Sequence, residues 1–314
     1  PRVRRQRQMC IRDRSVGGYA SPKKSFEIKR GVNLSHWLSQ RGENTPSIQD
    51  GMSATDFSRI ARAGFDHVRL PIDEEVLWQE NGQKNKEAFS YLHKGIEWAL
   101  KNDLRVIVDL HIVRSHYFNA GNEGKKNSLW EKPEAQTHFL ALWQDLVQEL
   151  KGYSTSDVAY EIMNEPTAPN HEDWNKLVEK AYQIIRKVEK ERVIVIGSNM
   201  WQGVDTFQYL KVPQGDEFIL LSCHFYEPFL LSHYQAGWTE FGKYQGNVHY
   251  PGYLVSKDEF DSLSADDKKL VARWRTTPWN RETLSAFLSK AKRVADEKGL
   301  NLYCGEFGIC LLYT

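Results

Sequence analysis

The sequence alternates short apolar runs, rich in β-branched residues, with longer stretches of helical period. This alternation predicts βαβ units, in which helices cover a parallel sheet. The predicted strands span residues 28–34, 67–70, 104–110, 158–163, 193–197, 218–225 and 300–305. The predicted helices span residues 54–63, 88–101, 134–151, 172–190 and 282–298. Polar turns bound the strands and no long alternating meander is present, so the strands should run parallel.

The order of these elements favours a barrel over an open sheet. No glycine-rich phosphate loop follows the first strand, which argues against a doubly wound sheet. We therefore predict an α/β fold, a TIM (β/α)8 barrel, as one domain over residues 15–308.

Residues 227–279 interrupt the alternation. This segment is aromatic, polar and too long for an ordinary connection. It has no regular hydrophobic period, so we expect a functional insertion at the mouth of the barrel rather than a second domain.

Composition and charge narrow the class of protein. The chain has 314 residues, with 42 Lys and Arg against 41 Asp and Glu, and 40% of its residues are hydrophobic. The balanced charge argues against a nucleic-acid binder, and no apolar run reaches the ~18 residues that a membrane span needs. Four cysteines in a chain this long do not form a disulfide scaffold. We expect a monomeric globular protein without nucleic-acid or membrane partners.

The two ends of the chain differ from the rest. Residues 1–14 contain six arginines and one aspartate, a net charge of 6 − 1 = +5, which leaves 1 − 5 = −4 for the remainder. A basic arm for an anionic partner is one interpretation. The strings at residues 9–14 and 310–314 resemble translated sequencing-adapter DNA. We therefore expect 1–14 to be a non-native or disordered tail and 309–314 to be a non-native tail, with Cys10 and Cys310 outside the native domain.

Polar side chains stand where the predicted strands end. The carboxyl ends of barrel strands form one rim, and catalytic groups project from it. The residues at these ends are Arg69 on the second strand, His111 on the third, Asn164 and Glu165 on the fourth, His224 and Tyr226 on the sixth, and Glu306 on the seventh.

Strict alternation along the seventh strand has a further consequence. It places Leu302, Cys304 and Glu306 on one face. By the same rule Cys223 faces away from Cys304, so we expect no joint disulfide or zinc role for these two cysteines.

A pair of carboxylates at the mouth of a barrel suits glycoside hydrolysis. One carboxyl group must donate a proton to the leaving oxygen, and the other must attack the anomeric carbon. In a retaining mechanism the two groups lie ~5–5.5 Å apart. Glu165 and Glu306 are the candidates, and their surroundings should separate their pKa values.

Six short motifs resemble glycoside hydrolase family 5, the cellulase family of retaining (β/α)8 glycosidases. They occur in the order of that family between residues 30 and 308. They are Gly31-Val32-Asn33, Val68-Arg69-Leu70-Pro71, Asp109-Leu110-His111, VAYEIMNEPT at 158–167, His224-Phe225-Tyr226 and Gly305-Glu306-Phe307-Gly308.

The resemblance implies roles for the residues at the strand ends. Glu165 would be the general acid/base and Glu306 the nucleophile. Asn164 would bind the sugar 2-hydroxyl. Arg69 and Tyr226 would lie beside Glu306 and keep it ionised. His111 and His224 would line the subsite at the cleavage point.

Structural interpretations stay open beside these roles. Arg69 could mainly neutralise Glu161, an interior carboxylate that would be costly to bury alone. Asp109 reads as an interior hydrogen-bonding group rather than a catalyst, and His67 as a packed core residue. His116 could contact a sugar or cap a loop.

The tryptophans divide by position. Trp98, Trp143 and Trp174 lie within helical patterns and should be core residues. Trp37 follows the first strand and Trp201 the fifth, where loops rim the mouth, so we expect both to stack on sugar rings. Trp238 in the insertion is a further candidate.

The resemblance implies an endo-β-1,4-glucanase that needs no cofactor and acts on a polysaccharide, in the secreted or periplasmic space. Mannan, xyloglucan and β-1,3-glucan are further candidate substrates. A metal-dependent barrel hydrolase is a rival interpretation, because His111, His116 and His224 are available, although no His-Glu-x-x-His motif is present. A carbohydrate-binding barrel without turnover is another.

The seven predicted strands are one fewer than the family has. In the family, the strand of the nucleophile is followed by a helix and an eighth strand. We therefore expect an incomplete barrel, open between its first and seventh strands. We expect the parent protein to be active and this fragment to be poorly stable and weakly active or inactive.

Overall fold

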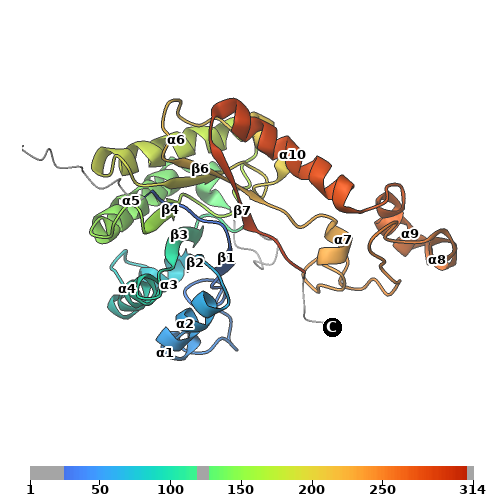
Figure 1. Ribbon diagram of the computed structural model, residues 1–314, viewed down its shortest axis with the longest axis horizontal. Helices are drawn as coiled ribbons and strands as arrows, with labels where there is room; N and C mark the ends of the chain where they lie inside the picture. The colour runs from blue at the N-terminus through green and yellow to red at the C-terminus, as the bar shows by residue number, and fades with distance from the viewer. Residues whose placement is uncertain (1–24, 119–126, 310–314) are drawn as a thin grey trace, which may run out of the picture.

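The computed structural model describes residues 25–118 and 127–309 (Figure 1). Seven parallel strands lie next to one another in chain order, β1-β2-β3-β4-β5-β6-β7. This is the nearly closed α/β barrel that the alternation predicts. The strands are β1 (Gly31–Asn33), β2 (His67–Asp73), β3 (Arg105–Ile112), β4 (Val158–Glu161), β5 (Ile194–Gly197), β6 (Ile219–His224) and β7 (Asn301–Glu306).

Helices follow the strands and cover the outside of the sheet (Figure 1). The long helices match the predicted ranges within two residues. They are α2 (Ala54–Arg62), α4 (Lys86–Leu100), α5 (Pro133–Leu150), α6 (His171–Val188) and α10 (Arg281–Lys298). The short ones are α1 (Ile48–Gly51), α3 (Glu74–Leu77), η1 (Ser128–Trp130), η2 (Val204–Tyr209), α7 (Phe229–Ser232), α8 (Lys257–Ser262), α9 (Ala265–Val271) and η3 (Ala272–Arg275). None of the described helices is long and apolar enough to cross a bilayer.

The sheet remains open between its first and last strands. Among the described residues no backbone ladder joins β7 to β1. Side chains bridge the gap instead: Asn33 Nδ2 donates to the carbonyl oxygen of Gly305 at 3.0 Å, and His67 Nε2 lies 3.3 Å from the hydroxyl of Tyr303. A groove of about 1050 Å³ follows the two strand edges.

The interior of the barrel is layered along its axis. At the amino ends of the strands, Ile107, Ala159 and Val195 form an apolar cluster, which Phe26 and Ile28 cover from the segment before β1. The next layer is charged and fully buried, with Arg69, Asp109 and Glu161. The residues that alternate with these, such as Val108, Leu110 and Tyr160, face the helices in the main core.

The insertion between β6 and α10 has a hydrophobic core, although its sequence shows no regular period. We call this core the insertion cluster: Leu230, Phe241, Tyr244, Leu254, Val255, Val271, Trp274 and Trp279. Phe287 on α10 packs against both this cluster and the barrel core. In Figure 1 the helices α8 and α9 lie at the far right, beyond the start of α10 and away from the sheet.

The predicted tails lie outside the described residues. Residues 1–14, which include Cys10, and residues 310–314, which include Cys310, are not among those that the structure describes. Only Ile309 of the second tail is described.

Candidate active site

Arg69 on β2 is the centre of a buried hydrogen-bond network. Its side chain is 1% exposed, and carboxylates and amide oxygens from several strands surround it. Its Nε donates to Glu161 Oε2 at 2.6 Å. Its Nη1 donates to Glu306 Oε1 at 2.7 Å and to Asn33 Oδ1 at 3.1 Å. Its Nη2 donates to Asn164 Oδ1 at 2.8 Å and lies 2.9 Å from Asp109 Oδ2.

Arg69 makes the contacts that both of its predicted roles require. It neutralises the interior carboxylates, and it also reaches Glu306 at the rim. Burial alone would lower the pKa of Arg69, but the charges of Asp109, Glu161 and Glu306 raise it above its usual value. Burial also raises the pKa of Glu161, against the charge of Arg69. The guanidinium therefore stays charged and fixes the carboxylates around it.

Glu306 ends β7 and is held in its ionised form. Burial would raise the pKa of its carboxyl group, but positive charge on His224, Arg69 and His111 and a hydrogen bond from Tyr226 lower that pKa to about 2. The Tyr226 hydroxyl donates to Glu306 Oε2 at 2.9 Å. An ionised carboxylate with 16% of its side chain exposed is available as a nucleophile.

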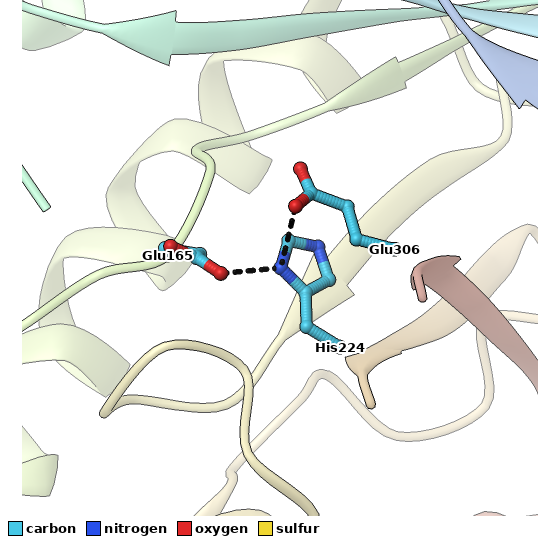
Figure 2. Close-up of side chains that lie close together, drawn as sticks. All are labelled: Glu165, His224 and Glu306. Atoms are coloured by element: carbon cyan, nitrogen blue, oxygen red, sulfur yellow. Dashed lines mark hydrogen bonds and ion pairs between the residues drawn. The ribbon is translucent and has the colours of Figure 1, made fainter. Parts of the chain in front are cut away.

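Glu165 lies opposite Glu306, and His224 lies between them (Figure 2). His224 Nδ1 is 2.8 Å from Glu165 Oε1 and 3.6 Å from Glu306 Oε2. The nearest ligand-type atoms of the three residues all lie within 4.8 Å of one another. Burial would lower the pKa of His224, but the two glutamates raise it. Glu165 has φ of 43°, an unusual left-handed conformation that turns the chain after β4.

His111 and Asn164 complete the floor of the site. His111 Nδ1 is bound to Asp109 Oδ2 at 2.7 Å, so Asp109 serves as the interior hydrogen-bonding group that the sequence suggested. Burial would lower the pKa of His111, but Asp109 raises it. His111 Nε2, Asn164 Nδ2 and His224 Nε2 are buried without a partner among the described residues. Buried polar atoms are normally hydrogen-bonded, so these three atoms can serve a ligand.

A β-bulge on β7 overturns the predicted alternation. The register shifts between Cys223 and His224, so Tyr303 and Glu306 both face the interior while Cys304 packs against the outer core. Cys223 and Cys304 are register partners and lie on the same face, contrary to the prediction that they face apart. Gly305 permits this geometry, because a Cβ atom there would lie 2.7 Å from Ser222 Oγ.

The prediction for Trp37 is wrong. The side chain is 1% exposed and cannot reach a sugar. It stacks on Trp98 with ring centroids 6.3 Å apart, and its Nε1 donates to the carbonyl oxygen of Ile48. The loop after β1 folds back onto α1 and α4, so the indole packs between helices.

Trp201 lies where an indole could meet a sugar. It is 50% exposed, and its Nε1 donates to the carbonyl oxygen of Phe118 at 2.6 Å. Trp238 is also exposed. His116 is buried, with Nε2 3.5 Å from the carbonyl oxygen of Glu165, and burial lowers its pKa to about 4.

Sequence reasoning missed two polar residues of the site. Asn33 contacts Arg69 and closes the gap to β7, and its place in the first motif was a usable signal. Gln202 is fully buried beneath Glu165. It stands in a loop after β5 with no motif around it, so nothing in the sequence marks it.

Glu165, His224 and Glu306 are also a donor set that a metal ion could use. Two features compete with this use. Arg69 places positive charge 2.7 Å from Glu306, and the carboxylate oxygens already accept hydrogen bonds from His224, Arg69 and Tyr226. The arrangement therefore suits acid–nucleophile chemistry better than cation binding.

A parallel barrel with two facing carboxylates at the carboxyl ends of β4 and β7 defines a glycoside hydrolase of the barrel type. The chain belongs to the cellulase family, glycosyl hydrolase family 5, which its residues 29–312 match. This is a family of retaining glycosidases, so the resemblance found in the six motifs is confirmed.

Individual relatives agree with this assignment. Endoglucanase C of Acetivibrio thermocellus is 31% identical over 287 residues, which cover 90% of this chain and 82% of the relative. Cellodextrinase A of Ruminococcus flavefaciens is 28% identical, with 91% and 77% covered. The solved structure of Thermotoga maritima Cel5A in complex with cellobiose is 25% identical and has a TM-score of 0.60. The match covers 91% of this chain and 93% of that structure.

Proposed function

We propose that this glycosidase is a retaining endo-β-1,4-glucanase, with Glu165 as general acid/base and Glu306 as nucleophile. The proposal depends mainly on one observation: the two carboxylates face each other across His224 with their nearest oxygens within 4.8 Å. A retaining mechanism needs a separation of ~5–5.5 Å, whereas an inverting one needs ~6.5–9.5 Å to admit a water.

In the first step, Glu306 attacks the anomeric carbon and Glu165 donates its proton to the leaving oxygen. The glycosidic bond breaks as the bond to Glu306 forms. Arg69 and Tyr226 keep Glu306 ionised and aligned. The Nδ2 donor of Asn164 would bind the sugar 2-hydroxyl, and the free Nε2 atoms of His111 and His224 would meet other hydroxyls of the same sugar.

In the second step, Glu165 has lost its proton and acts as a base. It takes a proton from a water, and the oxygen of that water attacks the anomeric carbon and releases Glu306. The hydrogen bond from His224 Nδ1 holds the Glu165 carboxylate in the position that serves both steps.

The substrate assignment is supported by the names of the relatives, an endoglucanase and a cellodextrinase, and by the cellobiose bound to the solved relative. Trp201 offers an exposed aromatic face beside the site. We further propose that the protein acts outside the cytoplasm, because a polymeric β-glucan does not enter the cell. All groups of the site come from one chain, so a monomer suffices.

The roles of the two glutamates can be separated with azide, which replaces the lost carboxylate. Glu165→Ala should lower kcat by ~10²–10⁴-fold on a β-1,4-glucan, and azide should restore turnover of an activated aryl cellobioside with the β-glycosyl azide as product. Glu306→Ala should lower kcat at least as far, and azide should yield the α-glycosyl azide. Product stereochemistry by NMR is the measurement.

The exposed Glu297 on α10 is the matched control, and Glu297→Gln should leave turnover unchanged. The assignment would be wrong if either active-site variant cleaved an unactivated glucan at near-normal rate. A panel of β-1,4-glucan, mannan, xyloglucan and β-1,3-glucan tests the substrate class by release of reducing ends. Loss of activity after exhaustive chelation would favour the metal-dependent alternative.

A further inference from the structure

The loop after β5 has an unusual backbone. Met200, Trp201 and Gln202 follow one another with φ of 58°, 57° and 53°. Left-handed conformations are unfavourable for non-glycine residues and persist only where surrounding contacts hold them. The loop packs on the segment after β4, because the amide of Trp201 donates to the carbonyl oxygen of Pro166 at 3.3 Å.

The side-chain amide of Gln202 connects Glu161, at the end of β4, with Glu165 in the segment that follows. Its Oε1 accepts a hydrogen bond from the backbone N–H of Glu165 at 3.1 Å. Its Nε2 donates to Glu161 Oε1, also at 3.1 Å. The chemistry fixes this orientation, since the backbone N–H can only donate and an ionised carboxylate can only accept.

The backbone of Gln202 holds the third member of the site. Its carbonyl oxygen accepts from the amide of His224 at 3.0 Å. Gln202 therefore contacts the backbone of both Glu165 and His224, the two residues whose side chains hydrogen-bond each other at 2.8 Å.

The fold reserves space for this side chain. Gln202 is fully buried. A Cβ atom on Gly197, at the end of β5, would lie 2.2 Å from Gln202 Cγ and Nε2. Only glycine at residue 197 leaves room for the amide, so this contact constrains the sequence at two positions.

We propose that Gln202 is a positioning residue for proton donation, because it fixes the backbone of Glu165 and so holds the carboxyl group at the glycosidic oxygen. Glu165 has φ of 43°, and its amide has no helix or strand partner. Without Gln202 the peptide is free to relax, and a displacement of ~1 Å from the reacting geometry can lower a rate ~100-fold. The inference rests on the proposed acid/base role of Glu165.

The test uses the dependence of the rate on the leaving group. Gln202→Met keeps the length of the side chain and removes both hydrogen bonds. For phenyl β-cellobioside, whose leaving group needs a proton, kcat/KM should fall ~100-fold. For 2,4-dinitrophenyl β-cellobioside, whose leaving group needs none, it should change less than ~3-fold. A merely structural role would lower both rates by the same factor.

A second variant protects the test against a folding defect. Gln202→Glu has the same size, and while protonated its carboxyl group can make both hydrogen bonds. Once ionised it loses the donor and repels Glu161. As pH rises, its kcat/KM for phenyl β-cellobioside should therefore begin to fall at a lower pH than that of the parent. The kcat/KM for the dinitrophenyl substrate should show no such fall.

Gln208 on η2 is exposed and provides the matched control, so Gln208→Met should behave as the parent with both substrates. Glu165→Gln tests the proposed function itself. If this variant lost the same rate factor with the phenyl substrate as with the dinitrophenyl substrate, the acid role would be refuted. If the rate loss in Glu165→Gln depends on the leaving group but the rate losses in both Gln202 variants do not, only the positioning role is wrong. Failure of both Gln202 variants to fold would also overturn it.

Discussion

The catalytic interior of the barrel and the insertion cluster are both buried, but they are built from opposite kinds of interaction. Around Arg69, nearly every contact is a directed hydrogen bond between charged or amide groups. In the insertion cluster, the buried contacts are mainly between aromatic and aliphatic side chains, as with Phe241 and Trp274 at a centroid distance of 6.4 Å.

The difference determines how each region responds to change. A charged network fails when one partner is removed, because the remaining charge is buried without compensation. An apolar cluster loses free energy in proportion to the volume removed and can partly relax. The interior should therefore tolerate almost no substitution, whereas the insertion cluster should tolerate exchanges between hydrophobic residues.

The largest effect on the stability of the whole domain should come from Arg69→Met. The variant leaves Glu161 and Asp109 buried without their cation, which should lower the free energy of unfolding by ~3–5 kcal/mol. Urea unfolding at several pH values is the measurement.

The pH dependence of this loss has a definite sign. Burial already raises the pKa of Glu161 in the folded protein, and removal of Arg69 raises it further. A folded pKa above the unfolded one gives stability that is present at low pH and lost as pH rises through the folded value. The variant should thus lie closer to the parent near pH 4 than near pH 7, and a constant difference would contradict this account of the network.

Phe241→Ala tests the other region. It should lower the stability of the insertion cluster by ~3–5 kcal/mol, the usual cost of truncating a buried Phe. Hydrogen exchange should show loss of protection in α8 and α9, with β2 to β6 unchanged.

The link between the two regions is Phe287, which packs on both cores. Phe287→Ala should therefore reduce protection in the insertion and in α10 together. Loss of protection throughout the barrel in Phe241→Ala would show that the two regions unfold as one unit.

Tyr226→Phe should have an intermediate effect and shift the pH profile. The hydroxyl of Tyr226 helps lower the pKa of Glu306 to about 2. Without it that pKa should rise, and because the nucleophile must be ionised, the acid limb of kcat/KM should move to higher pH. Near pH 6 the rate should fall ~10-fold, as expected for one hydrogen bond to a charged group. An unchanged acid limb would show that this bond does not tune Glu306.

The sequence was sufficient for the parts of the site that follow from strand ends. The carboxyl ends of parallel strands must meet at one rim, and six of the predicted residues lie there: His111, Asn164, Glu165, His224, Tyr226 and Glu306. Arg69 lies one layer deeper, because β2 continues to Asp73 instead of ending near residue 70. The barrel followed from alternation for the same reason, since both depend on local pattern.

Features set by contacts distant in sequence were not predictable. Trp37 is buried because its loop folds against helices, which no strand-end rule contains. The face of Cys304 depends on a bulge, and alternation cannot reveal where a strand gains a residue. The insertion cluster gathers residues from several short turns and so leaves no period. Gln202 acts through an amide whose partners lie 37 and 41 residues away.

The smallest effect should separate two exposed tryptophans, one from each region. Trp201 is anchored by its N–H to Phe118 beside the site, whereas Trp238 lies on the insertion. If only the barrel rim binds the glucan, Trp201→Ala should raise KM for cello-oligosaccharides ~2–10-fold, equivalent to ~0.5–1.5 kcal/mol of ring contact, with little change in kcat. Trp238→Ala should leave KM as in the parent. An equal rise in both variants would show that the insertion extends the binding surface, and the contrast between a catalytic barrel and a separate apolar appendage would then have to be abandoned.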